Sequence, residues 1–415
     1  MNTPKIRFKG FKDDWEQRKL GEVCEIKDSA RIPNSEWSES GVPYIRASDV
    51  TNENTDGVLF ISQERYEFYK NRTGAPTKDD VLFNGGGEIG KSLLITDEKP
   101  IYVQGGAVLY AQTSKSRELV GQYLKTYFET TNAKSYIDAA SAGGTMRHFT
   151  LKPSQIMRIL MPSVEEQEKI GEYFANLDQL ITLHQRKCDE TKQLKKFMLQ
   201  KMFPKNGEKN PEIRFEGFTD DWEQRKLSEL TTMHARIGWQ NLRTSEFLDS
   251  GDYMLITGTD FQEGVIDYST CHYVEKERYD QDKNIQIKNG SILITKDGTL
   301  GKVAYVQGLM MPATLNAGVF NVTIKNENIM DGKYLFQYLK APFLMDYVSK
   351  KATGGTIKHL NQSILVDFPV AMPKREEQVK ISRYFTALDN LITLHQRKCE
   401  KLKELKKFML QNMFV

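Results

Sequence analysis

A 27-residue stretch that occurs twice constrains the fold of this chain more than any other feature. Residues 177–203 read LDQLITLHQRKCDETKQLKKFMLQKMF, residues 388–414 read LDNLITLHQRKCEKLKELKKFMLQNMF, and 21 of the 27 positions are identical. In both copies, apolar or weakly polar residues recur at alternating spacings of four and three, the heptad pattern of a helix that packs against another helix. This seam consists of Ile170, Phe174, Leu177, Ile181, His184, Cys188 and Thr191 in the first copy and Ile381, Phe385, Leu388, Ile392, His395, Cys399 and Leu402 in the second.

Each copy predicts one long helix, the first from about Val164 to Met202. Ser163, followed by Glu166 three residues later, forms a capping-box pattern, which the second copy lacks because Lys374 replaces the serine. A helix with one apolar seam needs a partner, so the near-identity of the two helices favours antiparallel packing about a pseudo-two-fold axis. The alternative is that each helix lies on its own domain.

The repeat extends beyond the helices. Residues 4–23 and 211–230 agree at 15 of 20 positions, both containing the sequence WEQRKL, so the chain is an internal duplication. The segment 204–210, PKNGEKN, is polar and contains Pro and Gly, as a linker between the halves should. Trp15 and Trp222, in the repeated segments, are expected to anchor the start of each half in its core or against the helices; a partner contact is the alternative.

Between the shared ends, each half carries a variable block that predicts strands followed by one helix. This mixture favours an α+β globule with a curved sheet, and two globules joined by two long helices would form an elongated dumbbell. The expected strands are 43–46, 81–83, 92–96 and 101–111 in the first half and 253–257, 291–295, 302–306 and 318–324 in the second, with helices at about 117–140 and 331–351.

Composition excludes several classes of protein. With 39% hydrophobic and 27% charged residues, no apolar run long enough for a membrane span and no signal peptide, the chain is expected to be a soluble, cytoplasmic protein of two or three domains. The four cysteines lack metal-ligand spacing, and we expect them to be reduced. A net charge of +3 does not by itself indicate nucleic-acid binding, so local patches must decide, and each long helix is basic in its second half.

Three landmarks recur in the variable blocks at a constant offset. Asp49 corresponds to Asp260, GEIGK at 87–91 to GTLGK at 298–302, and GGTMRH at 143–148 to GGTIKH at 354–359. A repeated frame with two divergent faces can hold two copies of one partner while presenting two different recognition surfaces.

The sequence GGGEIGKS at 85–92 matches the P-loop pattern of nucleotide-binding proteins. A P-loop must open a helix, but the residues that follow, LLIT, form a strand pattern. We therefore expect a glycine-rich hairpin that lets the backbone and Lys91 approach a polyanion, or a plain tight turn. The paired glycines of the GGT loops could likewise free backbone amides for phosphate, or simply end a helix.

No catalytic or metal-binding constellation emerges from the sequence. The chain lacks an NPPY-like methyltransferase motif, GxSxG and HExxH. His184 and His395 lie in the heptad seam without further ligands at suitable spacing, so we interpret them as polar residues that specify helix register. The chain is expected to do no chemistry of its own.

The chain resembles the specificity subunit of Type I restriction-modification systems along essentially its whole length. The resemblance rests on MPSVEEQEKIGEYFANLDQLITLHQRK and MPKREEQVKISRYFTALDNLITLHQRK, on the WEQRKL repeats, and on the AGGTMRHFT and TGGTIKHLN loops. It implies two target-recognition domains, residues 1–162 and 211–373, a central conserved helix at 163–203, the linker at 204–210 and a C-terminal conserved helix at 374–415.

The resemblance also implies function and partners. Each recognition domain would read one half of a bipartite, asymmetric site in double-stranded DNA, and the antiparallel helices would fix the spacer. Two methyltransferase subunits would dock on the repeated frame, restriction subunits would join through them, and no membrane would be involved. S-adenosylmethionine, ATP and Mg would belong to those subunits, and this chain would need no cofactor.

Candidate DNA-contacting residues lie in the recurring landmarks. Those that follow the first strands, and are candidates for base edges, are Arg46, Ser48, Asp49, Thr257, Thr259 and Asp260. Those better placed for phosphates are Lys91, Thr145, Arg147, His148, Lys296, Lys302, Thr356, Lys358 and His359. Two other classes stay open: a scaffold that bridges two proteins without touching DNA, and a P-loop NTPase whose nucleotide binding would depend on Lys91.

Overall fold

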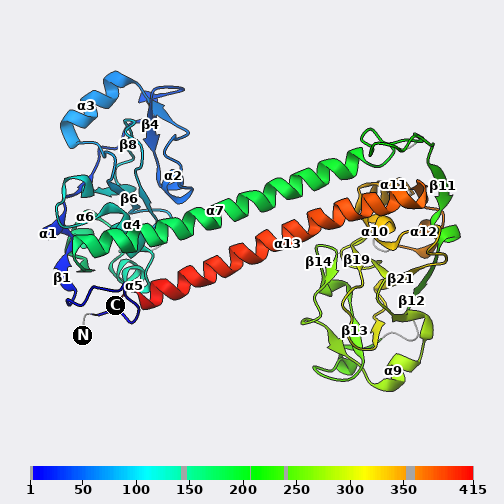
Figure 1. Ribbon diagram of the computed structural model, residues 1–415. Helices are drawn as coiled ribbons and strands as arrows, with labels where there is room; N and C mark the ends of the chain where they lie inside the picture. The colour runs from blue at the N-terminus through cyan, green and yellow to red at the C-terminus, as the bar shows by residue number, and fades with distance from the viewer. Residues whose placement is uncertain (1–2, 142–146, 206, 238–241, 352–359, 415) are drawn as a thin grey trace. The chain divides into compact units, whose positions relative to one another are not determined.

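The computed structural model describes residues 3–141, 147–205, 207–237, 242–351 and 360–414. The chain forms two compact units, and each is considered by itself: unit 1 is Met1–Gln185 with Gln396–Val415, and unit 2 is Arg186–His395. Both long helices, α7 (Val164–Lys201) and α13 (Arg375–Asn412), contribute to both units (Figure 1). None of the helices among the described residues combines the length and apolar character that a membrane span requires.

The heptad seam is the contact between the two helices, which run antiparallel in each unit. In unit 1, the Cys399 thiol lies 4.0 Å from the backbone oxygen of Ile181. In unit 2, the Cys188 thiol lies 4.0 Å from the backbone oxygen of Ile392. Most seam positions are buried and none is fully exposed, with His184 and His395 half-buried. The predicted helix from Val164 and its antiparallel pairing are therefore confirmed.

Unit 1 is built from two four-stranded sheets and the helices that cover them. One sheet has the order β2-β9-β6-β7 and the other β3-β5-β4-β8, while β1 and β10 form a separate antiparallel ribbon. The elements are β1 (Glu16–Lys19), α1 (Leu20–Val23), β2 (Ile26–Asp28), β3 (Trp37–Ser38), β4 (Val42–Ile45), α2 (Ala47–Thr51), β5 (Phe60–Ile61), α3 (Gln63–Thr73), β6 (Val81–Asn84), β7 (Ser92–Leu94), β8 (Tyr102–Val103), β9 (Val108–Ala111), α4 (Gly121–Phe128), α5 (Thr131–Ala140), α6 (Leu151–Ile156) and β10 (Arg158–Met161).

The layers of unit 1 follow from the alternation of side chains along β6. Val81 and Phe83 face a core that includes α4, α5 and the first turns of α7, whereas Leu82 faces a second core shared with β4 and β8. All three side chains are fully buried, as expected for a strand between two layers. The helix α3 covers the outer sheet, on the side away from α7 (Figure 1).

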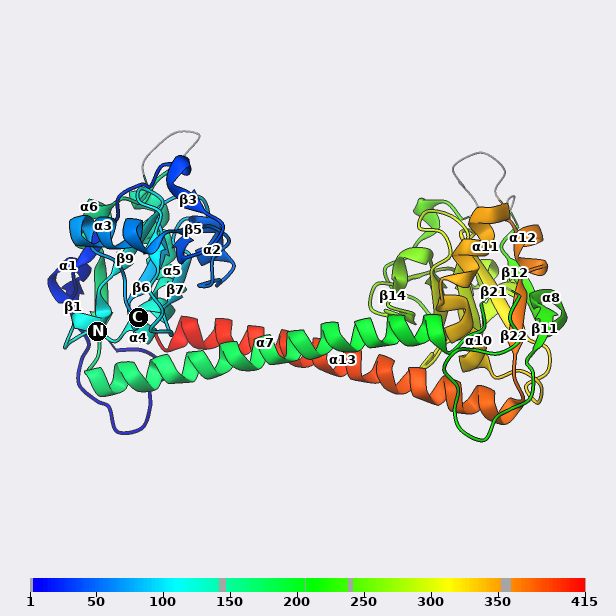
Figure 2. The same cartoon turned by 90° about the horizontal axis from the view of Figure 1, so that it is seen from above.

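Unit 2 repeats this plan. Its sheets have the orders β12-β21-β18-β19 and β16-β13-β20-β17, and β11 pairs with β22 as β1 pairs with β10. The elements are β11 (Glu223–Lys226), α8 (Leu227–Leu230), β12 (Thr231–Ala235), β13 (Met254–Ile256), η5 (Gly258–Asp260), β14 (Phe261–Gln262), β15 (Val265–Ile266), β16 (His272–Tyr273), α9 (Lys276–Asp280), β17 (Gln286–Ile287), β18 (Ile292–Thr295), β19 (Val303–Tyr305), β20 (Ala313–Leu315), β21 (Val319–Ile324), α10 (Gly332–Lys340), α11 (Phe343–Lys351), α12 (Gln362–Val366) and β22 (Pro369–Met372) (Figure 2).

The single helix predicted in each variable block is wrong, because two helices occupy each segment. In unit 1, the Thr130 side chain accepts a hydrogen bond from the N–H of Ala133 and so starts α5 afresh after α4. In unit 2, Pro342 separates α10 from α11, since proline disfavours the helical conformation of the residue before it. The expected strand 101–111 is also wrong, because β8 and β9 belong to different sheets.

Aromatic side chains fasten the helix ends to the globular parts. In unit 1, Phe414 packs edge-on against Trp15, which is 2% exposed. In unit 2, Phe203 packs edge-on against Trp222 and stacks on Phe385. The prediction that both tryptophans anchor the start of each half in its core is confirmed.

The expected capping box of α7 is only half formed. The N–H of Glu166 points to Ser163 Oγ at 3.4 Å, but the Glu166 carboxylate binds the guanidinium of Arg7 instead of the chain before the helix. Glu377 binds Arg214 in the same way in unit 2. Both carboxylates are almost fully buried. Leaving a buried carboxylate without a cation costs more free energy than leaving a helix without its second cap.

Candidate nucleic-acid interface

In unit 1, hydrogen bonds to backbone oxygens bring the three landmark segments together beside one end of β6. The Asn84 amide donates to the backbone oxygen of Ala47 at 2.9 Å, which places the turn after β4 against the β6–β7 hairpin. The N–H of Phe149 donates to the backbone oxygen of Gly85 at 2.8 Å, which adds the segment that follows residue 146. The sequence offset alone did not show that these segments meet.

The hairpin at 85–91 provides an exposed cation on a tight backbone turn. Gly87 and Gly90 adopt positive φ angles of 68° and 79°, which glycine accommodates without strain. The Lys91 side chain is 58% exposed, and its ammonium lies 3.9 Å from Glu88. The strand β7 follows this turn and pairs antiparallel with β6, so the segment is the expected hairpin and not a P-loop.

Arg147 and His148 extend this surface. The Arg147 guanidinium donates to Asp138 at 2.8 Å and stays 43% exposed. His148 is exposed and lies beside the hairpin, where a Cβ built on Gly86 would come within 3.2 Å of its Nδ1 atom. Thr145 lies outside the described residues.

The two landmark aspartates are buried, and each holds a turn. Asp49 is 3% exposed and accepts from the Arg46 backbone N–H at 2.9 Å and from its guanidinium. Asp260 is also 3% exposed and accepts from the Thr257 backbone N–H at 2.7 Å. In this structure both carboxylates therefore bind groups of their own turn, and a contact of either with a base stays a prediction.

The polar neighbours of these aspartates remain candidates. Ser48 and Thr259 are exposed, while Arg46 and Thr257 are half-buried. Arg46 shares its charge with Asp49, and Thr257 donates its hydroxyl to Asp260 at 2.9 Å. Their exposed atoms lie on the turn that follows β4 in unit 1 and β13 in unit 2.

Unit 2 assembles the same frame with different side chains. The N–H of Lys296 donates to Gly318 and its backbone oxygen accepts from Leu360, both at 2.8 Å. The Lys296 ammonium lies 5.7 Å from the centre of the Phe320 ring, while Lys302 is exposed directly before β19. Thr356, Lys358 and His359 lie outside the described residues.

A cavity of about 440 Å³ opens beside this hairpin, and sequence reasoning missed it. Its lining residues are Ala235, Arg236, Ile237, Lys296, Asp297, Phe320, Leu360, Asn361 and Gln362. Asp297 directly follows a residue that the sequence singled out, and Asn361 follows the second GGT loop. Position next to a landmark was thus the available signal, but only the fold shows that the two residues share a cavity.

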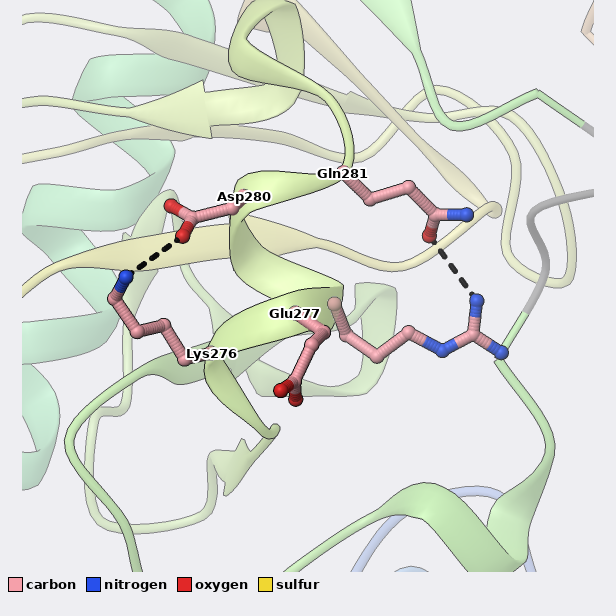
Figure 3. A pocket seen from close by; sticks show the side chains of 5 residues that line it. Lys276, Glu277, Asp280 and Gln281 are labelled. Atoms are coloured by element: carbon pink, nitrogen blue, oxygen red, sulfur yellow. Dashed lines mark hydrogen bonds and ion pairs between the residues drawn. The ribbon is translucent and has the colours of Figure 1, made fainter.

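A second hollow lies along the short helix α9 (Figure 3), and most of its charged side chains have partners. The Lys276 ammonium lies 3.1 Å from Asp280, and Arg278 donates to Gln281 at 3.1 Å. Arg278 also forms an ion pair with Glu246. We therefore assign no ligand to this hollow.

The buried thiols and the histidines do not suggest chemistry. Burial raises the pKa of Cys24 and of Cys271 to about 12, so neither thiol ionises near neutral pH. The described part of the chain contains no group of three His, Cys, Asp or Glu side chains arranged for a metal ion.

Several relatives with curated names are similar to this chain in sequence. Over 422 residues the chain is 22% identical to a putative Type I restriction enzyme MjaX specificity subunit of Methanocaldococcus jannaschii, covering 98% of this chain and 94% of that protein. It is 23% identical over 292 residues to the MjaVIII specificity subunit of the same organism, covering 68% and 67%. It is 20% identical over 394 residues to the EcoBI specificity subunit of Escherichia coli, covering 89% and 78%.

Solved structures share the fold. The crystal structure of a Type I restriction-modification system S subunit from M. genitalium superposes with a TM-score of 0.66 at 14% identity, covering 100% of this chain and 99% of that one. The family described as Type I restriction modification DNA specificity domain matches residues 12–193 and 219–404, one copy in each half. These two matches span most of the sequence and coincide with the internal duplication, and the chain therefore belongs to the Type I restriction-modification DNA specificity family.

Proposed function

We propose that this chain recognises DNA for a Type I restriction-modification complex and that unit 1 and unit 2 each read one half of a bipartite, asymmetric site. The observation that carries the proposal is that the two units share one frame but carry different side chains on the equivalent hairpins. The same hydrogen-bonding position holds Gly85 in unit 1 and Lys296 in unit 2, and the next position holds Gly86 and Asp297. Equal frames place the two loops equivalently, while different side chains select different bases.

The cationic and polar groups on these loops suit DNA in two ways. Lys91, Arg147 and Lys302 carry exposed or half-exposed charges that would bind phosphates and position the duplex. Ser48 and Thr259 would lie closer to base edges. Specificity would then come from side chains that differ between the units, and affinity from the cations.

Methyltransferase subunits would dock on an apolar strip that each unit presents on its helices. In unit 1 the strip consists of Leu180, Leu183, Leu405 and Phe408, and in unit 2 of the equivalent residues Leu391, Leu394, Leu194 and Phe197. All of these side chains are between 40% and 52% exposed. Residues three apart share a helix face, and exposed apolar side chains that gather in this way mark interaction sites.

The duplication of the strip argues for two copies of one partner. Leu180 and Leu391 occupy equivalent positions, as do Phe408 and Phe197, so each unit offers the same surface. Restriction subunits would join the complex through the methyltransferase subunits. S-adenosylmethionine, ATP and Mg would be used by those partners, and the assembly would work in the cytoplasm.

Complex assembly tests this proposal. We expect the chain co-expressed with its cognate methyltransferase subunit to form a complex with two copies of that subunit, measured by native mass spectrometry. Leu405→Asp with Phe408→Asp should remove one copy, as should Leu194→Asp with Phe197→Asp, because a charge in an apolar interface is not solvated. The control Lys407→Asp changes an exposed charge on the same helix and should leave both copies bound.

DNA retention by the complex tests the other half of the proposal. A complex that holds two methyltransferase subunits but fails to retain DNA at low salt would contradict DNA recognition and favour a protein-bridging scaffold. Retention that weakens steeply with salt is the expected result, because phosphate contacts release counterions.

A further inference from the structure

In unit 1, the segment that follows β2, residues 28–32, packs on the turn between β8 and β9. The Asp28 carboxylate accepts a hydrogen bond from the N–H of Gly106 at 2.9 Å. A Cβ at Gly105 would lie 1.7 Å from the backbone oxygen of Ser29, so only glycine allows this close approach. The segment is therefore fixed against the turn by a hydrogen bond and by direct backbone packing.

The same turn joins this segment to the landmark segments of the proposed DNA surface. The backbone oxygen of Ala107 accepts from the N–H of Gly85 at 2.9 Å, at the start of the glycine-rich hairpin. The N–H of Gln104 donates to the backbone oxygen of Ile45 at 2.8 Å, directly before the first landmark turn. The segment after β2 thus lies at the same edge of unit 1 as the candidate DNA-contacting residues.

Two buried tyrosine hydroxyls hold the backbone on both sides of Arg31. The Tyr102 hydroxyl accepts a hydrogen bond from the N–H of Ala30 at 3.1 Å, and the Tyr44 hydroxyl accepts one from the N–H of Ile32 at 3.2 Å. Both tyrosines are fully buried, and their rings stack across the paired strands β4 and β8. Ile32 is 1% exposed and belongs to the same core. The fold therefore orders the backbone that carries Arg31.

The Arg31 side chain is available to a partner. It is exposed and makes no hydrogen bond or ion pair with any other residue that the structure describes. By contrast, the Arg46 guanidinium lies 3.1 Å from Asp49. The Arg147 guanidinium lies 2.8 Å from Asp138. A ligand of Arg31 therefore has to break no ion pair and to order no backbone, both of which lower affinity.

Unit 2 builds this place differently. According to the strand pairing, the positions of Tyr44 and Tyr102 hold Leu255 and Thr314 in unit 2. Thr314 accepts a hydrogen bond from the guanidinium of Arg236, which is 1% exposed. The pair of tyrosine hydroxyls is therefore a feature of unit 1, and a role in recognition should affect one half of the DNA site.

We propose that Arg31 is a specificity-determining residue of unit 1 that reads a guanine, and that Tyr44 and Tyr102 are its positioning residues. The inference rests on the proposed function, since it takes this edge of unit 1 to face DNA. The planar guanidinium donates two parallel hydrogen bonds, which fit the O6 and N7 acceptors of guanine in the major groove. A phosphate contact needs only positive charge, whereas a bidentate base contact also needs a fixed orientation, which the two hydroxyls support.

The modified sequence in a cell tests the role of Arg31. The chain is co-expressed with its cognate methyltransferase subunit in a methylation-free host, and methylated adenines are mapped across the genome. Arg31→Ala should relax one position in one half of the motif, where the unaltered chain requires guanine, by about 5- to 150-fold in discrimination. Arg31→Lys keeps the charge but lacks the planar fork, so it should relax the same position.

The tyrosines are tested by removing only their hydroxyls. Tyr44→Phe and Tyr102→Phe keep the buried rings and should each reduce discrimination at the same position by about 2- to 10-fold, the effect of one lost hydrogen bond. Thermal unfolding of each variant separates this effect from a loss of stability. An unchanged motif in both variants would show that the hydroxyls support the fold but do not position Arg31.

Arg117→Ala is the matched control. Arg117 is also exposed and without a hydrogen bond or ion pair to another described residue, but it follows the opposite end of β9. Its replacement should leave the motif unchanged. Native mass spectrometry of every variant checks that the complex with the methyltransferase subunits still forms.

The outcomes distinguish this inference from the function on which it rests. If Arg31→Ala methylates the same motif as the unaltered chain, or lowers methylation equally at all sites, Arg31 does not read a base. If Arg31→Lys keeps the full motif while Arg31→Ala does not, charge alone suffices and the bidentate contact is wrong. Changes in both halves of the motif would contradict a role confined to unit 1. If the unaltered chain in an intact complex yields no bipartite motif, the proposed function fails and this inference fails with it.

Discussion

The guanidinium of Arg7 binds Glu166 in unit 1, and that of Arg214 binds Glu377 in unit 2, both with Nε–Oε1 distances of 2.7 Å. At the other end of each globular part, the position of Gly85 in unit 1 is occupied by Lys296 in unit 2. This ion pair on the helix side of each unit is thus duplicated, whereas the side chains on the loop side differ. This difference supports the proposal that the frame accepts two identical partners while the loops recognise two different sequences.

One contact on the helix side breaks the duplication. In unit 1, the Lys406 ammonium lies 2.6 Å from Asp178 and also pairs with Glu129, so this lysine has two carboxylate partners. In unit 2, Lys195 binds Asp389 at 2.5 Å, but Lys340 takes the place of Glu129. Burial and the neighbouring Lys195 lower the pKa of Lys340 to about 8. Where the helices meet the globular part, the lysine of unit 1 is therefore compensated by two carboxylates, whereas in unit 2 two lysines lie beside one carboxylate.

The largest effect on stability should come from the aromatic anchors, Phe414 in unit 1 and Phe203 in unit 2, which occupy equivalent positions. Phe203→Ala and Phe414→Ala should each lower the free energy of unfolding by about 4 kcal/mol, because each leaves a cavity under a buried tryptophan. Calorimetric unfolding measures both. The control Phe197→Ala removes a side chain that is 48% exposed and should cost less than about 0.5 kcal/mol. Clearly unequal losses for the two anchors would contradict the duplicated frame.

The buried ion pairs should give the next largest effect. Arg7→Ala and Arg214→Ala should each destabilise the protein by about 3 kcal/mol, because each leaves a glutamate that is almost fully buried without its cation. Chemical denaturation at neutral pH checks the prediction. Replacing both partners, as in Arg214→Leu with Glu377→Leu, should cost less than Arg214→Ala alone; a larger cost would show that the pair contributes more than charge compensation.

The strained lysine of unit 2 offers a substitution that should stabilise the protein. Lys340→Glu recreates the arrangement around Glu129 and should raise the free energy of unfolding by about 1 kcal/mol, because Lys195 gains a second acid. The reciprocal change in unit 1, Glu129→Lys, should destabilise it by a similar amount. Thermal unfolding of both variants measures this exchange, and changes of the same sign in both would contradict the comparison.

The same lysine predicts a pH dependence with a definite sign. Its pKa falls from 10.5 in the unfolded chain to about 8 in the folded one, so the unfolded state binds more protons between these values. Stability should therefore rise with pH from about 8 to 10.5 relative to Lys340→Met, which lacks the titrating group. Melting curves of the two proteins across this range test the sign, and a fall would exclude a strained lysine.

The smallest expected effect concerns the loop of unit 1. Lys91→Ala should weaken DNA binding by the assembled complex for all sequences alike and reduce the slope of log affinity against log salt by about one. Titrations at several salt concentrations, with cognate and unrelated duplexes, measure this. A change in which sequence is preferred would instead show that Lys91 reads bases.

The sequence predicts those features of the fold that a periodic pattern of residues specifies. It does not predict features that depend on single capping residues or on contacts between distant segments. The heptad seam specified the pairing of α7 and α13, and the strand pattern LLIT after Lys91 correctly indicated a hairpin in place of a P-loop. The breaks at Thr130 and Pro342 were missed, because an amphipathic pattern continues across them. The Thr130 hydroxyl nevertheless caps the start of α5, and Pro342 disfavours the helical conformation of the residue before it.

The candidate site shows the same limit. The recurrence of Asp49 and Asp260 was read as a DNA-contacting feature, but both carboxylates hold a turn. A repeated residue can serve the frame as well as the function, and sequence does not separate the two. Arg31 was missed because its segment joins the landmark segments only when distant parts of the chain meet.

The most direct test of the account exchanges the variable part of unit 1. Residues 24–162 are replaced by the corresponding segment of another family member, the chain is co-expressed with its methyltransferase subunit, and methylated adenines are mapped across the genome. The account predicts a bipartite motif in which one half changes and the other half stays the same. A motif that changes in both halves, or in neither, would contradict the claim that the two units read DNA independently from one shared frame.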